Sequence, residues 1–285
     1  MSLLRRSADI INDATAYVAG GLLTTAETTS QKVADKLYAL QLFEMDKIVY
    51  PTEEVNVALA AIGTNKGVVV RRGTYTETDT PIVLDGQHIH FDHALLNIAD
   101  SKYFDNPSDD NVLTGHLRIA GTGDTTDSAT RKLMRVAATR CDWSGCFIQL
   151  IPDYTTTPIA ASGRMCQLSG HNCKIKVFAE NVTATTASWF QWFTMNEGDG
   201  NEYDLTLRTA LTSAAGANSA GLYFNGEQNI VKLCFDDITD TAGTIIGVAL
   251  TGTADYNSIH GVARDIDGTT VTDAGTGNVV TGLAV

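Results

Sequence analysis

The segment Asn229-Ile230-Val231-Lys232-Leu233-Cys234-Phe235 decides the fold that this sequence predicts, because similar segments recur along the second half of the chain. Each begins with an asparagine and continues as a short strand with apolar residues at alternate positions. The other four begin at Asn172, Asn201, Asn257 and Asn278. The successive spacings between the five asparagines are 29, 28, 28 and 21 residues. A repeat of this length indicates stacked coils rather than one globular core.

A second set of strand-like segments lies between the asparagine segments, at residues 189–193, 221–224 and 244–248. Turns rich in Gly, Asn, Asp and Thr separate the two sets, so each coil carries at least two strands. Further strands are expected upstream, at residues 88–91, 116–119, 133–136, 146–151 and 165–168. The pattern predicts an all-β solenoid, a parallel β-helix of about seven coils when roughly 205 residues are divided by ~28 residues per coil.

The recurring asparagines have a structural interpretation that requires no ligand. On stacked coils, alternate side chains point inward and lie on their equivalents one coil above and below. An asparagine at the same corner of each coil can bond the backbone of the next coil, and it tolerates left-handed dihedral angles. We therefore expect Asn172, Asn201, Asn229 and Asn257 to form a ladder along one corner.

Residues 1–54 form a separate region with helical patterning. Residues 30–45 carry apolar side chains at helical spacing behind a capping serine, and residues 8–18 show a similar face. These short helices have little to pack on locally, so they must lie on the β body, on copies of themselves or on another protein. Residues 55–285 are assigned to the β-helix, which begins with a short capping helix at residues 55–62.

The junction between these regions resembles the opening of a right-handed parallel β-helix of the pectate-lyase-like superfamily. Five residues match the family pattern G-x-V-V-x-x-G-x-Y, namely Gly67, Val69, Val70, Gly73 and Tyr75. Residues 81–84 continue the pattern as a further strand, whereas Arg72 stands where the family usually has a proline. In that family a helix caps the open bottom of the solenoid. The resemblance covers residues 52–285 and implies a fold without specifying a function.

Within that superfamily, a helical segment in front of the β-helix is similar to bacteriophage tailspikes and head spikes. In those proteins the N-terminal part attaches a trimeric β-helix to the virion. The resemblance implies that this chain is a homotrimer on a virion surface, and that residues 1–54 bind a capsid or tail protein. This inference is an analogy at the level of the fold.

The overall charge and hydropathy exclude several classes of partner. The formal net charge is -13, and two arginines adjoin only at Arg5-Arg6 and Arg71-Arg72, so we expect no binding to nucleic acid. No run of eighteen apolar residues occurs, so no membrane insertion is expected. Residues 1–20 are interrupted by charged and amide residues before a long apolar stretch forms, which predicts synthesis in the host cytoplasm without a signal peptide.

Cysteine and histidine patterns offer few metal or redox sites. The five cysteines, Cys141, Cys146, Cys166, Cys173 and Cys234, contain no C-x-x-C pair and are expected to be small buried side chains. A disulfide between Cys141 and Cys146 is an alternative. His88 and His90 lie on one face of a strand at a spacing that metals can use, but the sequence assigns no third ligand. We assign no metal or cofactor.

The strongest catalytic candidates are acidic residues at equivalent positions of adjacent coils, because glycoside hydrolysis needs two carboxyl groups ~5–9 Å apart. The eighth position after each asparagine holds Glu180, Thr209, Asp237 and Asp265. The seventh position holds Ala179, Arg208, Asp236 and Arg264, which predicts that Asp236 lies between two arginines. Asp237 and Asp265 are therefore the best candidates, with Asp236 and Asp267 nearby. A solvated turn edge or a calcium-binding column would give the same pattern.

An aromatic stretch, Trp189-Phe190-Gln191-Trp192-Phe193, supplies a second candidate surface. Strand alternation places Trp189 and Gln191 on one face and Phe190 and Trp192 on the other. One set would fill the core, and the other would bind sugar or pack against a neighbouring subunit.

These observations favour a non-enzymatic structural protein on a bacteriophage-like virion surface, attached through its N-terminal segment. The alternative is a tailspike-type polysaccharide depolymerase or lyase that recognises a host surface glycan and uses the acidic column. A carbohydrate-binding module without turnover is a third hypothesis. We assign no catalytic residue.

Overall fold

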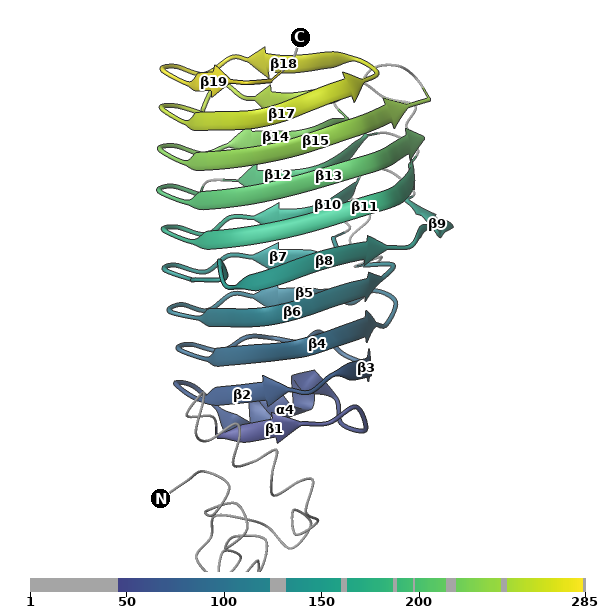
Figure 1. The fold of residues 1–285 in the computed structure, drawn as a ribbon, viewed down its shortest axis with the longest axis vertical. Coiled ribbons are helices and arrows are strands. Elements are labelled where there is room, and N and C mark those ends of the chain that lie inside the picture. The colour runs from purple at the N-terminus through teal and green to yellow at the C-terminus, as the bar shows by residue number, and fades with distance from the viewer. Residues whose placement is uncertain are drawn as a thin grey trace, which may run out of the picture.

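The computed structural model describes residues 46–123, 132–159, 163–186, 189–196, 198–213, 219–241 and 245–283. Within these residues the chain forms two parallel β-sheets that face each other, with a short helix, α4, at one end (Figure 1). The helices expected at residues 8–18 and 30–45 lie outside the described residues.

The larger sheet contains twelve strands and the smaller sheet contains seven. The strands of the larger sheet are β1 (Lys47–Val49), β2 (Gly67–Val70), β3 (Gly73–Glu77), β4 (His88–Ile98), β6 (Val112–Gly121), β8 (Cys146–Pro152), β9 (Tyr154–Ile159), β11 (Lys174–Thr186), β13 (Glu202–Ser213), β15 (Ile230–Asp240), β17 (Ser258–Ile266) and β19 (Val279–Thr281). Those of the smaller sheet are β5 (Phe104–Asn106), β7 (Met134–Val136), β10 (Gly163–Leu168), β12 (Phe190–Asn196), β14 (Ala220–Asn225), β16 (Ile246–Leu250) and β18 (Thr269–Asp273).

The chain winds from one sheet to the other, and successive coils stack in order. The larger sheet follows the path β1-β2-β4-β6-β8-β11-β13-β15-β17-β19, and the smaller sheet stacks its seven strands in the order β5-β7-β10-β12-β14-β16-β18. In Figure 1 the front strands run left to right, the rear strands return, and the chain climbs from β1 to β18, which is a right-handed winding. The predicted all-β parallel solenoid is therefore confirmed. Residues 81–84 are an exception among the expected strands, since they contribute only an isolated bridge from Ile82 to Asp105.

Inward-facing side chains form columns through the stack. Ile175, Tyr203, Val231 and Ile259 are neighbours in successive coils, and all four are buried. Burying one side chain of this size stabilises the fold by ~1.5–3 kcal/mol. Because a residue of each coil covers its equivalent in the next, no coil can bury its apolar face alone.

The short helix closes the lower end of this core. α4 (Val55–Ile62) buries Val55, Ala58 and Leu59, and Gly63 ends it with a φ of 76°. The Glu77 carboxylate accepts the first free backbone N–H groups of the helix, from Val55 (2.8 Å) and Asn56 (3.0 Å). The expected capping helix is confirmed. β1, which precedes it, pairs with β2 and belongs to the stack as well.

Asparagine side chains connect the coils along one buried corner. The Asn229 Nδ2 group donates to Gly198 O (2.8 Å), and its Oδ1 accepts from the backbone N–H of Asn201 (2.9 Å), both one coil below. Asn201 and Asn257 make the same two bonds to their own lower coils. Each side chain is only 1% exposed. The predicted ladder is confirmed for these three residues.

The ladder position below Asn201 is Cys173 rather than Asn172, which corrects one predicted member. The register pairs Lys174 with Glu202, so Asn172 lies one residue too early and is exposed. The Cys173 Sγ atom accepts from the backbone N–H of Cys141 (3.3 Å) and donates to Ala138 O (3.4 Å). The thiol thus makes the same two kinds of bond as the asparagine amide.

The residue before each ladder position is left-handed in every coil from β4 to β19. Its φ lies between 54° and 69° at Gly86, Asp110, Arg140, Asn172, Gly200, Gln228, Tyr256 and Gly277. Glycine and asparagine adopt this region easily, whereas Arg140, Gln228 and Tyr256 do so at a cost. The tertiary bonds of the corner therefore impose this conformation on residues that do not prefer it.

We predict that Asn229→Ala destabilises the protein by at least the ~1–3 kcal/mol expected for a buried backbone group that loses its partner. The substitution removes the acceptor of Asn201 N and the donor to Gly198 O. Chemical denaturation monitored by circular dichroism would measure the loss. Asn97→Ala, at an exposed position of β4, is the control and should change stability little. Equal effects of the two substitutions would contradict the structural role of the ladder.

Candidate functional site

Charged side chains of alternating sign follow one another up the outer surface of the larger sheet. The register pairs Glu180 with Arg208, Arg208 with Asp236, and Asp236 with Arg264. The Arg264 guanidinium donates two hydrogen bonds to the Asp236 carboxylate, at 2.7 and 2.9 Å. The predicted position of Asp236 between two arginines is confirmed, and Glu180 extends the column by one coil.

Hydrogen bonds from Arg264 hold the pKa of Asp236 below its usual value, and the same contact raises the pKa of the arginine. Two further pairs have this geometry, with the arginine one coil above the carboxylate. They are Arg135 with Asp105 and Arg140 with Asp110. The hydrogen bonds from Arg140 likewise lower the pKa of Asp110, and carboxylates kept ionised as Asp110 and Asp236 are poorly suited to act as general acids.

The column of acidic residues predicted at the eighth position after each asparagine differs from the structure at one residue, Glu180. Glu180 belongs to the charge column above, and the residue beside Thr209 is Asn181. Asn181, Thr209, Asp237 and Asp265 form the column at a bend of the sheet, with φ values of 54°, 47°, 56° and 51°. Only the two upper coils therefore place an acid there, one at Asp237 and one at Asp265.

A shallow groove follows this bend. It has a volume of about 330 Å³ and is lined by Asn181, Thr183, Thr209, Ala210, Leu211, Asp237 and Thr239. Its polar groups are hydroxyls, one amide and the Asp237 carboxylate, which suits hydrogen bonding to a polar ligand. Asp265 is not among the lining residues. A pair of carboxyl groups, as glycoside hydrolysis requires, is therefore not gathered within this groove.

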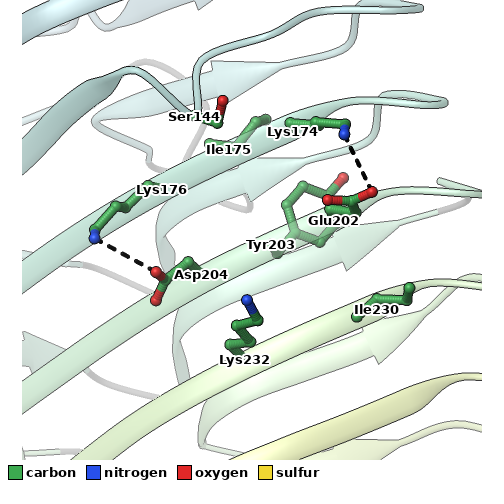
Figure 2. A pocket seen from close by; sticks show the side chains of 9 residues that line it. All are labelled: Ser144, Lys174, Ile175, Lys176, Glu202, Tyr203, Asp204, Ile230 and Lys232. Carbon is green, nitrogen blue, oxygen red and sulfur yellow. Dashed lines mark ion pairs between the residues drawn. The ribbon is translucent and has the colours of Figure 1, made fainter.

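A second cavity lies on the outer face of the larger sheet (Figure 2). It has a volume of about 210 Å³ and is lined by Ser144, Lys174, Ile175, Lys176, Glu202, Tyr203, Asp204, Ile230 and Lys232. Lys174 pairs with Glu202 at 3.3 Å, and Lys176 pairs with Asp204 at 3.5 Å. The Lys232 ammonium has no hydrogen-bond or ion-pair partner within the described part of the chain. The cavity therefore holds one cation whose charge is not locally paired.

Rings stack in a column lower on the same sheet. The ring centroids are 5.0 Å apart between His93 and His116, 4.9 Å between His116 and Phe147, and 5.6 Å between Phe147 and Phe178. Burial lowers the pKa of the His116 imidazole, with a smaller effect from His93, and so favours the neutral ring. This aromatic column escaped the sequence analysis because its members come from four coils of different length.

The histidine pair His88 and His90 lies on β4, with Ile89 buried between them. His90 Nδ1 is 3.0 Å from Thr114 Oγ1. No group of three or more His, Cys, Asp or Glu side chains that could hold a metal is present among the described residues. The pair is therefore not joined by a third ligand there.

The aromatic stretch of β12 is used inside the protein. Phe190, Trp192 and Phe193 are fully buried, and Gln191 is nearly so. The Trp192 indole donates to Thr212 Oγ1 at 3.1 Å, and the Phe193 ring stacks on Phe235. Only Trp189 is partly exposed, with the Arg164 guanidinium 5.8 Å from its ring. The prediction that one of the two groups of side chains faces outward is therefore wrong for Gln191, which is buried.

The five cysteines are free thiols, so the alternative of a Cys141–Cys146 disulfide is not realised. Burial raises the pKa of Cys146 to about 12 and also raises that of Cys166. These thiols are packing groups rather than nucleophiles. Within the described part of the chain, no helix combines the length and hydropathy that a membrane span requires.

Comparison of the sequence with protein-family models finds no match, and comparison with curated proteins finds none either. The parallel β-solenoid therefore rests on the structure itself, and the resemblance to the pectate-lyase-like superfamily stays a prediction.

We predict that Arg264→Gln raises the pKa of Asp236 toward the ordinary aspartate value, because the two hydrogen bonds to the ionised form are lost. In the native protein the lowered pKa means that the pair stabilises the fold above the ordinary aspartate pKa, and that this contribution disappears as pH falls through the lowered value. Titration of ¹³C-labelled aspartate carboxyls by NMR would measure the shift.

Arg140→Gln is the matched control, since it breaks the same kind of pair with Asp110 several coils away. It should leave the Asp236 titration unchanged. An unchanged Asp236 pKa in Arg264→Gln would show that the contact does not persist in solution.

Proposed function

We propose that this protein is a non-enzymatic structural component of a bacteriophage-like virion surface, assembled as a homotrimer of β-solenoids. Residues 1–54 attach it to a capsid or tail protein. It is made in the host cytoplasm. Its task is to form a rigid body that projects from the particle and resists unfolding.

One observation carries this proposal: the buried amides and several carboxylates of the solenoid bond to the neighbouring coil. The asparagine ladder is buried and saturated with coil-to-coil bonds, and Asp105, Asp110 and Asp236 are each held by an arginine of the next coil. Side chains committed in this way stabilise a stack and are not available for proton transfer. This chemistry supports a structural role over catalysis.

The positions of the first and last described strands support attachment through one end of the body. β1 lies at the lower end of the stack, beside the capping helix, and β18 and β19 lie at the opposite end (Figure 1). A segment that precedes β1 therefore joins the body at the end closed by α4. This arrangement is suited to a projection held at its base.

Analysis of particles released when the source cells lyse would test this proposal. We expect the chain to co-purify with density-gradient particles in a fixed stoichiometry. A deletion of residues 1–45, which leaves β1 and α4 in place, should remove it from the particles. The control is the circular dichroism spectrum and thermal transition of the truncated protein, which should match those of the full chain. Particles without the chain, or unchanged incorporation of the truncated protein, would contradict the proposal.

The groove of about 330 Å³ along the bend of the larger sheet supports a second candidate function, recognition of a host surface glycan. Its hydroxyl, amide and carboxylate groups can bond sugar hydroxyls, and exposed Leu211 offers an apolar contact for a sugar ring. We predict that binding to capsular or lipopolysaccharide preparations, measured by calorimetry, weakens about tenfold or more in Asp237→Asn, since a hydrogen bond to a charged group contributes ~1.5–3 kcal/mol.

Asp265→Asn is the matched control for this experiment, because it occupies the same bend one coil further and does not line the groove. It should bind like the unmodified protein. Release of new reducing ends or unsaturated products, abolished by Asp237→Asn, would identify a depolymerase or lyase instead. Absence of binding in the unmodified protein would exclude glycan recognition for the preparations tested.

A further inference from the structure

Two buried cysteines occupy consecutive positions of the ladder, one coil apart. A parallel bridge from Asp142 to Lys174 sets the register of the two coils, so Cys173 lies directly above Cys141. The backbone N–H of Lys174 donates to Cys141 O at 2.8 Å, and the backbone N–H of Cys141 donates to the Cys173 Sγ atom at 3.3 Å. Neither cysteine is more than 2% exposed. The two thiols are therefore held beside each other inside the corner.

The spacing of the coils suits a disulfide between these two residues. Neighbouring strands lie ~4.8 Å apart, and a disulfide joins Cα atoms that are ~4.4–6.8 Å apart. Both side chains project to the same side, because they stand at equivalent positions of a parallel stack. A bond between the sulfur atoms therefore needs rotation of the side chains and little movement of the backbone. The register gives Cys146 and Cys166 no thiol as a neighbour among the described residues.

The contact between the two side chains makes the thiols chemically different. A hydrogen bond with the Cys141 side chain lowers the pKa of Cys173, and the same contact raises the pKa of Cys141. Burial raises the pKa of Cys146 and Cys166 instead. Because the thiolate is the reactive form of cysteine, Cys173 is the most readily activated of these four residues, and a protonated thiol lies beside it.

The corner that holds the pair is close to solvent. His171 and Asn172, which precede Cys173, are exposed, and so is Asp142, which follows Cys141. Local opening of this turn brings the sulfur atoms into contact with solvent without unfolding of the sheets. Hydrogen peroxide, an oxidant little larger than water, can reach the pair in that way.

We propose that Cys141 and Cys173 form a disulfide when the protein meets hydrogen peroxide. The Cys173 thiolate attacks one oxygen of the peroxide, the O–O bond breaks, and a sulfenic acid and a hydroxide ion form. The Cys141 sulfur then attacks the Cys173 sulfur, and the hydroxyl group leaves as water with the proton of the Cys141 thiol. The two thiols lose two electrons and the peroxide gains them. The proton released by Cys173 converts the hydroxide into a second water molecule.

The bond encloses one whole coil in a covalent loop. β8, β9 and β10 all lie between Cys141 and Cys173 in the chain. A cross-link of this kind stabilises a fold mainly by restricting the unfolded chain. In return the protein loses the hydrogen bond from the Cys173 thiol to Ala138 O, which is long at 3.4 Å. This chemistry does not depend on the proposed role at a virion surface.

Peptide mass spectrometry of the full chain after brief exposure to hydrogen peroxide tests this inference. We expect a linked pair of peptides that contain Cys141 and Cys173, lighter by two hydrogen atoms and separated by dithiothreitol. Cys141→Ala should give no linked pair, and dimedone should then trap the sulfenic acid at Cys173. Cys166→Ala is the matched control, because Cys166 is also buried but has no thiol beside it in the register. It should form the link as the unmodified protein does.

Thermal unfolding of the unmodified protein keeps the inference testable if Cys141→Ala fails to fold. The oxidised protein should unfold at a temperature at least about 4 °C higher than the same sample after dithiothreitol, because the cross-link closes a long loop. Equal transition temperatures, no linked pair after oxidation, or links that join other cysteines would overturn the inference. Sulfinic acid at Cys173 without a link would overturn it as well, since the Cys141 sulfur would then not reach the sulfenic acid.

Discussion

Satisfaction of backbone polar groups at one corner of every coil is the constraint on which this structure depends. A coil that turns sharply leaves N–H and C=O groups that the β-ladders cannot pair, and burial makes such groups costly. The ladder side chain solves this by donating to a carbonyl and accepting from a backbone N–H, both in the coil below, as Asn229 does toward Gly198 and Asn201. Each corner is therefore completed by the next coil. Because neither coil can close its corner alone, this bond joins local turn geometry to the stability of the whole stack.

The sequence reveals this ladder only where its chemistry is uniform. From Asn201 upward the residue is always asparagine, at spacings of 28, 28 and 21 residues, so the repeat and the fold could be predicted. Below Asn201 the ladder passes through Cys173, Cys141, Asn111 and Gln87, separated by 32, 30 and 24 residues. A thiol can replace an amide here since it also donates and accepts, as Cys173 does. Residue identity alone does not reveal that equivalence, and the nearby Asn172 therefore produced a register error of one residue.

This register error of one residue at Asn172 also limited how much of the candidate site could be predicted. Asp236 was placed correctly between Arg208 and Arg264 because all three follow true ladder asparagines. Glu180 was placed one position too late, which made the bend appear more acidic than it is. The prediction that some side chains of β12 face outward was wrong for another reason. Strand alternation assigns side chains to two faces, but it does not say whether the second face is covered, and Gln191 is buried on a strand whose Phe190 and Trp192 are buried too.

A stacked fold divides its chemistry between the coils and their surroundings. Side chains that repeat at one position from coil to coil, such as the ladder asparagines and the arginine–aspartate pairs, act on the neighbouring coil. Outward side chains that do not repeat are free of that demand, so their character reports what the surface contacts. On the outer face of the larger sheet, Lys174 and Lys176 pair with Glu202 and Asp204 of the next coil, whereas Lys232 has no such partner among the described residues. The carboxylates of this surface are therefore committed to contacts between coils, and the group left to meet the surroundings is a cation.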